Sequence, residues 1–176
     1  MSHLDTVDLE HPQLELAAAI LRSGAAIRVR ALGASMLPAI WPGDLLAITP
    51  VPYSAIRAGE IVLCVRNGRF CIHRLIHVGS INGDANWITR GDALADPDPG
   101  VPAEAILGRV SSITRGRRTL TPRPLTALGR IFAWILSHSD LLCRLILRIH
   151  SLRQRFWTRR QMLMGRHQFL PPQTAQ

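Results

Sequence analysis

The chain has 176 residues, 47% of them hydrophobic, which is enough for one well-buried core but cramped for two independent domains. All 21 residues counted as Lys+Arg are arginine, so a lysine general base is excluded. The charges are unevenly distributed, because residues 1–112 contain 9 arginines and 11 acidic residues, whereas residues 113–176 contain 12 arginines and Asp140 alone. The basic C-terminal third is therefore expected to attract polyanions, either anionic lipid headgroups or nucleic acid.

The cysteines and the apolar stretches limit the class of protein further. Cys64, Cys71 and Cys143 are odd in number and lack CxxC spacing, which predicts neither a disulfide framework nor a structural metal site. The apolar segment 14–21 is too short for a secretion signal, and no stretch has the roughly 18 uninterrupted apolar residues of a spanning helix. We therefore predict a protein of the cytoplasm or of the inner face of the membrane, without a cofactor.

The first predicted elements are a helix, a strand and a rigid loop. Apolar residues recur at helical spacing over 12–23, and a Ser-Gly pair provides a stop. Apolar and polar residues then alternate over 27–31, which predicts a half-buried strand. The strand leads into residues 33–44, where two glycines and two prolines predict an irregular, stiff loop. This loop presents a single hydroxyl, that of Ser35.

The segment after the loop is rich in strand and turn signals. Strands are predicted over residues 45–49, 61–66, 69–78, 86–90 and 106–113. Asn67-Gly68 lies between two β-prone runs and predicts an antiparallel hairpin. Short strands with turn signals at this frequency predict a mainly β fold, a small antiparallel barrel or sandwich.

The C-terminal region differs in kind. From Leu125 onward, apolar residues recur every three or four positions with a break at 137–140, which predicts two amphipathic helices. Arginines give the second helix a basic face, a pattern typical of a helix lying on a membrane surface. A helical hairpin packed on the β region or on another subunit, with its arginines in solvent, is an interpretation of at least equal weight, and nucleic acid is the least favoured partner. We divide the chain into a tail and helix (1–24), a β catalytic domain (25–118) and a basic helical extension (119–176).

Ser35 is a candidate nucleophile, but a serine hydroxyl needs a neighbouring base to take its proton. Because lysine is absent, histidine is the remaining common base, and only His73 and His77 fall within the predicted β region. A carboxylate should orient the imidazole. Three carboxylates in one loop, those of Asp92, Asp96 and Asp98, are candidates, and spacing does not choose among them.

Residues of the strand and of the loop admit two other interpretations. Cys71, His73 and His77 project to one face of a strand, but no fourth residue has suitable spacing to complete a metal site, so none is predicted. Asp44 follows a glycine in the loop and is expected to cap the turn rather than to act in catalysis.

Five motifs between about residues 30 and 112 resemble those of type I signal peptidases, in the same order. They are Gly33-x-Ser35-Met36-x-Pro38 followed by Gly43-Asp44; Ala58-Gly59-Glu60-Ile61-Val62; Ile72-His73-Arg74-Leu75; Ile88-Thr89-Arg90-Gly91-Asp92 with Asp98; and Leu107-Gly108-Arg109-Val110. With no lysine available, the chain resembles the Ser-His subtype of archaea and the endoplasmic reticulum. The resemblance implies a β-barrel-like signal-peptidase fold, shared with the self-cleaving SOS repressors, and serine endopeptidase activity.

The resemblance also implies roles for individual residues. Ser35 would be the nucleophile and His73 the base, assisted by Asp98, with Asp92 as a second assisting carboxylate and Asp96 as the less favoured alternative. The Ser35 backbone N–H would meet the oxyanion. A strand edge would bind the peptide by β-augmentation, and shallow pockets would accept small side chains such as alanine. Met36 and Pro38 are predicted to line this groove.

The substrate implied is a polypeptide cleaved after small residues. Enzymes of this subtype usually carry a spanning helix just before the serine motif, whereas the corresponding segment here contains Arg22, Arg28 and Arg30. Secretory signals and cytoplasmic leader peptides therefore both stay open as substrates. The alternative function is a non-catalytic module of the same fold that docks on membrane or nucleic acid through its basic helices.

Overall fold

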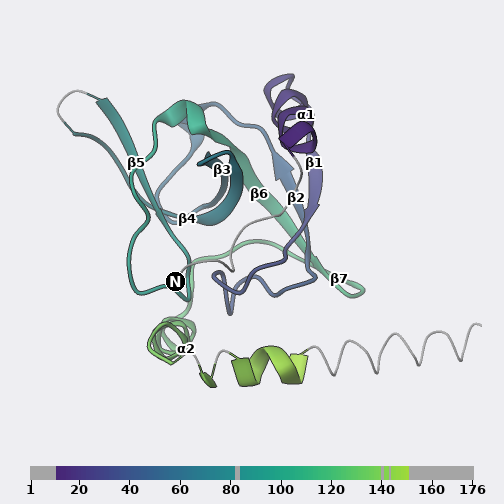
Figure 1. Ribbon diagram of the computed structural model, residues 1–176, viewed down its shortest axis with the longest axis vertical. Coiled ribbons are helices and arrows are strands. Elements are labelled where there is room, and N and C mark those ends of the chain that lie inside the picture. Colours follow the sequence, from purple (N-terminus) through teal and green to yellow (C-terminus); the bar gives the residue numbers. More distant parts are fainter. Residues whose placement is uncertain (1–10, 82–83, 140, 143, 151–176) are drawn as a thin grey trace, which may run out of the picture. The chain divides into compact units, whose positions relative to one another are not determined.

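The computed structural model describes residues 11–81, 84–139, 141–142 and 144–150. The chain divides into two compact units, Met1–His138 and Ser139–Gln176. The first unit contains the whole β-sheet and the helices that flank it in sequence (Figure 1). The predicted division at residues 24 and 118 into tail, catalytic domain and extension stays a prediction.

Seven antiparallel strands form one strongly curved sheet (Figure 1). They are β1 (Ile27–Arg30), β2 (Leu45–Thr49), β3 (Ile61–Arg66), β4 (Arg69–Ile81), β5 (Asp84–Arg90), β6 (Ile106–Arg115) and β7 (Arg118–Leu120). The strand order is β1-β2-β6-β3-β4-β5, with β7 paired to β6. This confirms the predicted mainly β, antiparallel fold, but β1 and β5 end the order and the sheet of described strands is open rather than a closed barrel.

The β3–β4 hairpin has the tight turn that the sequence predicts. Asn67 and Gly68 both have positive φ, 50° and 68°, as the first and second central residues of a type I′ turn require. This turn fixes the register from Arg66 opposite Arg69 to Ile61 opposite Arg74. β4 continues past the end of β3 and pairs with β5, so the hairpin brings β4 into the centre of the candidate site described below.

The central strand β3 is buried on both faces. Its first four residues, Ile61 to Cys64, are each at most 1% exposed. Ile61 and Leu63 pack into one apolar cluster with the helix α1 (His11–Arg22), while Val62 and Cys64 belong to a second cluster around Trp87. A strand covered on both sides has no polar alternation, which explains its continuous apolar sequence.

The sequence pattern did not predict β7. All three of its residues are exposed, so no burial alternation marks it in the sequence. β7 follows the turn at Gly116 and pairs antiparallel with the last residues of β6. β6 itself runs two residues beyond the predicted strand.

The helix α2 (Ala127–Ser137) begins where the apolar spacing predicts. The Thr126 side chain caps it, because Oγ1 accepts a 3.1 Å hydrogen bond from the Gly129 N–H. Residues 141–142 and 144–150, in the second unit, are also helical. The rest of the second predicted helix, from residue 151, lies outside the described residues. None of the described helices combines the length and apolar character needed to cross a bilayer.

Candidate active site

The loop that carries Ser35 is closed at its base by backbone hydrogen bonds. The Ala31 N–H donates to the Asp44 carbonyl at 2.9 Å, and the Gly43 N–H donates to the Ala31 carbonyl at 2.8 Å. Gly43 has a φ of +92°, which a residue with a side chain rarely adopts. The loop thus returns to its starting point and holds Ser35, which is 7% exposed, in a fixed position.

The Asp44 carboxylate stabilises the far end of this loop. Its Oδ2 accepts a 2.8 Å hydrogen bond from the Trp41 N–H and lies 2.7 Å from an Arg115 nitrogen on β6. The side chain of Asp44 is 3% exposed, so this paired charge is buried. Asp44 therefore fastens the Ser35 loop to the sheet.

His73 lies between Ser35 and Asp98. Its Nε2 is 3.0 Å from the Ser35 Oγ, and its Nδ1 is 2.6 Å from the Asp98 Oδ2. An ionised carboxylate can only accept a hydrogen bond, so Nδ1 donates to Asp98 and the neutral ring keeps the Nε2 lone pair for the serine hydroxyl. We refer to these three residues as the Ser35–His73–Asp98 series. The chain brings them together from the loop after β1, from β4 and from the loop after β5.

Two further residues, Arg66 and Thr89, hold the Asp98 carboxylate. Thr89 Oγ1 donates to Asp98 Oδ2 at 2.6 Å, and Arg66 Nη1 lies 2.9 Å from Asp98 Oδ1. Arg66 Nη2 also donates to Thr89 Oγ1 at 3.0 Å, and the Asp98 N–H donates to the Thr89 carbonyl at 2.8 Å. Both oxygens of Asp98 are therefore fixed before any substrate binds.

Sequence reasoning did not assign either of these supporting residues. Thr89 lies within the fourth motif that resembles signal peptidases, directly before the acidic loop, and this was the only available signal. Arg66 ends β3 beside the hairpin turn, and nothing local distinguishes it from an ordinary turn-flanking arginine.

The surroundings shift the protonation of His73 and Asp98 in opposite directions. Burial disfavours the charged imidazolium, but the hydrogen bonds to Asp98 and Cys71 outweigh it and raise the pKa of His73 to about 9. Burial likewise disfavours the Asp98 carboxylate, but the hydrogen bonds from His73 and Arg66 outweigh it and hold the pKa of Asp98 well below its usual range. The pair therefore favours the imidazolium–carboxylate form at neutral pH.

The other two candidate carboxylates have different surroundings. The two Asp92 oxygens each accept a 2.7 Å hydrogen bond from Arg74, which also donates to the Gly59 carbonyl at 2.6 Å. Asp96 is exposed. Of the three carboxylates in the acidic loop, Asp98 is the one with a hydrogen bond to His73.

The acidic loop also supports Ser35 through its backbone. The Ala93 N–H donates to the Ser35 carbonyl at 2.7 Å. At Gly91, a Cβ atom would lie only 2.9 Å from the Ser35 Cβ, so the loop can approach this closely only with glycine at that position. The Asp92–Arg74 pair thus stabilises the loop segment whose backbone is hydrogen-bonded to Ser35.

Among the described residues, Cys71, His73 and Asp98 are the group whose ligand atoms lie close enough to hold a metal ion, all within 4.8 Å of one another. The 2.6 Å separation of His73 Nδ1 and Asp98 Oδ2 is a hydrogen-bond distance, whereas two such ligands on one tetrahedral zinc lie about 3.3 Å apart. The guanidinium of Arg66 at Asp98 also opposes a cation. The arrangement fits a hydrogen-bonded pair better than a metal centre.

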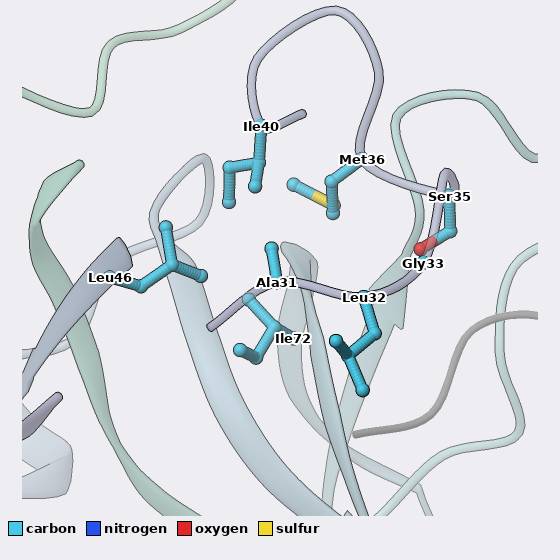
Figure 2. A pocket seen from close by; sticks show the side chains of 8 residues that line it. All are labelled: Ala31, Leu32, Gly33, Ser35, Met36, Ile40, Leu46 and Ile72. Atoms are coloured by element: carbon cyan, nitrogen blue, oxygen red, sulfur yellow. The ribbon is translucent and has the colours of Figure 1, made fainter. Parts of the chain in front are cut away.

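A small pocket opens beside Ser35 (Figure 2). Its volume is about 30 Å³, which is room for a small group rather than an aromatic ring. The lining residues are Ala31, Leu32, Gly33, Ser35, Met36, Ile40, Leu46 and Ile72. Of the two residues predicted to line the substrate groove, Met36 is among them and Pro38 is not.

Comparisons with known proteins agree with the motifs. The family described as Peptidase S24-like matches residues 3–86. The catalytic subunit SEC11C of the signal peptidase complex is 42% identical to this chain over 76 residues in Homo sapiens, in Mus musculus and in Canis lupus familiaris. Over these segments the chain is similar to S24-like peptidases and to signal peptidase catalytic subunits. The matched segment covers 42% of this chain and 40% of each SEC11C protein, so the chain spans less than half the length of these relatives.

The family match and the structure cover different parts of the site. The segment that matches the S24-like peptidase family includes Ser35 and His73 and ends before the acidic loop. Asp98 lies outside the matched segment. Its contact with His73 is therefore seen in the structure of this chain, where the pairing of β4 with β5 brings the acidic loop to His73.

Proposed function

We propose that the protein is a serine endopeptidase of the signal-peptidase type that cleaves a protein or leader peptide after a small residue. The observation that carries this proposal is the Ser35–His73–Asp98 series, with separations of 3.0 Å and 2.6 Å. A hydroxyl, an imidazole and a buried carboxylate in this order are what activation of a serine nucleophile requires. The similarity to S24-like peptidases and to signal peptidase catalytic subunits supports the same class of reaction.

The reaction proceeds in two acyl-transfer steps. Ser35 Oγ attacks the carbonyl carbon of the scissile peptide bond while His73 Nε2 takes its proton. The Ser35 backbone N–H stabilises the oxyanion, and collapse of the tetrahedral intermediate breaks the C–N bond as the imidazolium protonates the leaving amine. Water then attacks the ester, giving one proton to His73, and Ser35 recovers its hydroxyl as the carboxylic acid product leaves. Asp98 keeps Nδ1 protonated throughout.

The pocket beside Ser35 supports the preference for small side chains. Its apolar wall includes Met36, Ile40 and Ile72, and its volume of about 30 Å³ admits a methyl group such as that of alanine. Residues 31–33 line the pocket and lead from the terminal strand β1 to the nucleophile (Figure 2). An extended peptide that pairs with this segment would place alternate side chains toward the pocket.

The test is to incubate the full chain with peptides that contain an Ala-x-Ala sequence and to locate the cleaved bond by mass spectrometry. We expect cleavage after the second alanine, and rapid acid quenching should trap an ester on the tryptic peptide that contains Ser35. Peptides with phenylalanine in place of that alanine serve as the control and should be cleaved far more slowly. Absence of both cleavage and ester, with the protein folded, would contradict the proposal.

The raised pKa of His73 predicts a strongly alkaline pH profile. Only the neutral imidazole can accept the serine proton, and with a pKa of about 9 the neutral form is about one part in a hundred at pH 7. We expect kcat/KM to rise about tenfold per pH unit below pH 8 and to level off above pH 9. The midpoint of the profile is expected within about one unit of pH 9. A profile that is already flat between pH 6 and pH 8 would contradict the assignment of His73 as the base.

The same shift has an effect on folding that the pH experiment must control. A pKa raised in the folded state contributes stability at low pH that is lost as the pH rises from about 6.5 through about 9. Circular dichroism at each pH will separate loss of fold from titration of the active site.

The charge of Arg66 is expected to tune this profile. Arg66 offsets part of the negative charge of Asp98, so Arg66→Met should raise the pKa of His73 further and move the midpoint of the profile upward. The loss in kcat/KM should be about tenfold at pH 8 and small above pH 10. Arg66→Lys, which retains the charge, is the matched control. A loss that is equal at every pH would assign Arg66 a purely structural role.

A further inference from the structure

The helix α2 exposes an apolar face to solvent. Leu128, Ile131, Trp134 and Ile135 are 79%, 56%, 63% and 38% exposed. At about 100° per residue these four side chains lie within about 120° of the helix circumference. We call them the α2 apolar face. Four large apolar side chains gathered on one short helix indicate a surface that binds something, unlike single apolar residues scattered over a protein.

The described helical residues after 140 repeat this pattern. Leu141, Leu142, Leu145 and Ile149 are 79%, 40%, 53% and 50% exposed. They lie within about 100° of the circumference of their own helix. Each of the two helices, taken by itself, therefore has an exposed apolar face.

The charges beside these faces are of one sign. Arg130 is exposed about 40° from Trp134 on α2, and Arg144 is exposed about 60° from Leu141 on the second helix. Residues 113–176 as a whole contain 12 arginines and a single acidic residue, Asp140. Each helix thus combines exposed apolar side chains with a nearby exposed arginine, and α2 also exposes a tryptophan.

The charge and the length of the helix identify the partner. A second copy of the chain would bring like charges together, and nucleic acid offers no apolar phase for leucine and isoleucine side chains. α2 has 11 residues, a length of about 16 Å, against the roughly 30 Å of a bilayer core. A helix of this kind lies in the plane of an anionic lipid surface, with its apolar side below the headgroups and arginines among the phosphates.

We propose that the α2 apolar face and the apolar face of residues 141–149 dock the protein on an anionic lipid surface. The proposal is independent of the peptidase function, because it uses no residue of the Ser35–His73–Asp98 series. It gives the basic C-terminal region a stated role, that of a reversible surface attachment.

The test uses the full chain in flotation with vesicles of phosphatidylcholine and phosphatidylglycerol, compared with vesicles of phosphatidylcholine alone. We expect binding to the anionic vesicles at low salt, much weaker binding at high salt, and little binding to the neutral vesicles. Arg130→Gln with Arg144→Gln should lower the partition coefficient about 25-fold, since each arginine near an anionic surface contributes about fivefold. The matched control is Arg22→Gln with Arg69→Gln, two exposed arginines of the first 112 residues.

A second pair of variants tests the apolar contribution. Ile131→Glu with Trp134→Glu should lower the partition coefficient roughly 100-fold, because two exposed apolar side chains that would enter the lipid are replaced by charges. Leu16→Glu with Val78→Glu replaces exposed apolar side chains elsewhere, 62% and 42% exposed, and should have only the small effect of two added charges. Circular dichroism of each variant checks the fold.

Three results would overturn the proposal. One is binding that is equal on neutral and anionic vesicles. Another is no vesicle binding by a folded chain that forms a dimer disrupted by Trp134→Glu, which would assign the α2 apolar face to a second copy. The third is no vesicle binding together with salt-dependent DNA binding that Ile131→Glu with Trp134→Glu leaves unchanged.

Discussion

The Ser35→Ala variant is expected to lose kcat/KM on the order of 10⁶-fold, the size of effect seen when the nucleophile of a serine protease is removed. Ser35 is 7% exposed and its Oγ is 3.0 Å from His73 Nε2, so the substitution deletes the attacking atom and leaves the packing almost unchanged. The measurement is the rate of peptide cleavage at the pH optimum, with unfolding followed separately. Ser54→Ala, which removes an exposed hydroxyl elsewhere, is the control and should retain full activity.

The double variant sharpens this test. His73→Ala alone should cost nearly as much as Ser35→Ala, because the hydroxyl is a poor nucleophile without its base. Residues that act as one unit are not additive, so Ser35→Ala combined with His73→Ala should be no slower than either single variant. A double variant that falls by the product of the two single effects, or a single variant within about tenfold of the parent, would show that the two residues do not act together.

Local patterns predicted most of the fold because local physics determines it. The Asn67-Gly68 turn sets the β3–β4 register, and the helix α1 follows from its apolar spacing. The pattern failed at β7, where every side chain is exposed and no alternation exists. It also could not tell a closed barrel from an open sheet, since closure depends on whether β1 and β5 meet, and these strands are distant in sequence.

The candidate site divides in the same way. The stiff loop around Ser35 and the absence of lysine could be read from the sequence and left His73 and His77 as candidate bases, and the resemblance to signal peptidases favoured His73. The contact of Arg66 with Asp98 could not be predicted from the sequence, because Arg66 extends to Asp98 from the end of β3, across the β3–β4–β5 part of the sheet. Contacts of this kind depend on register between strands, and a residue list gives no information on which of two arginines will face a carboxylate.

The choice among the acidic-loop residues illustrates the limit most clearly. Asp92, Asp96 and Asp98 are chemically equivalent in the sequence, and it was the resemblance to signal peptidases that favoured Asp98. In the structure, the Asp98 N–H donates to the Thr89 carbonyl, and this bond sets the carboxylate of Asp98 beside the His73 ring. Asp92, only six residues earlier, pairs with Arg74 instead.

Asp98→Asn is therefore expected to lower kcat/KM about 10⁴-fold at the pH optimum of the parent. An asparagine amide can donate to Nδ1, which favours the tautomer with the proton on Nε2, and that ring can no longer accept the proton of Ser35. The imidazolium formed during attack also loses its counter-charge. The measurement is kcat/KM across the pH range, in which the alkaline midpoint near pH 9 should move down as the pKa of His73 falls.

Asp92→Asn is expected to have the opposite balance of effects. The substitution leaves the half-buried Arg74 without a charged partner, so the free energy of unfolding should fall by roughly 3 kcal/mol. Where the variant is folded, kcat/KM should stay within about tenfold of the parent, because Asp92 reaches Ser35 only through the backbone of its loop. Asp96→Asn, at an exposed position, is the control for both measurements. Equal losses of kcat/KM in folded Asp92→Asn and Asp98→Asn would mean that both carboxylates orient the His73 ring. A large loss confined to Asp98→Asn would assign this role to Asp98, the carboxylate that contacts the ring.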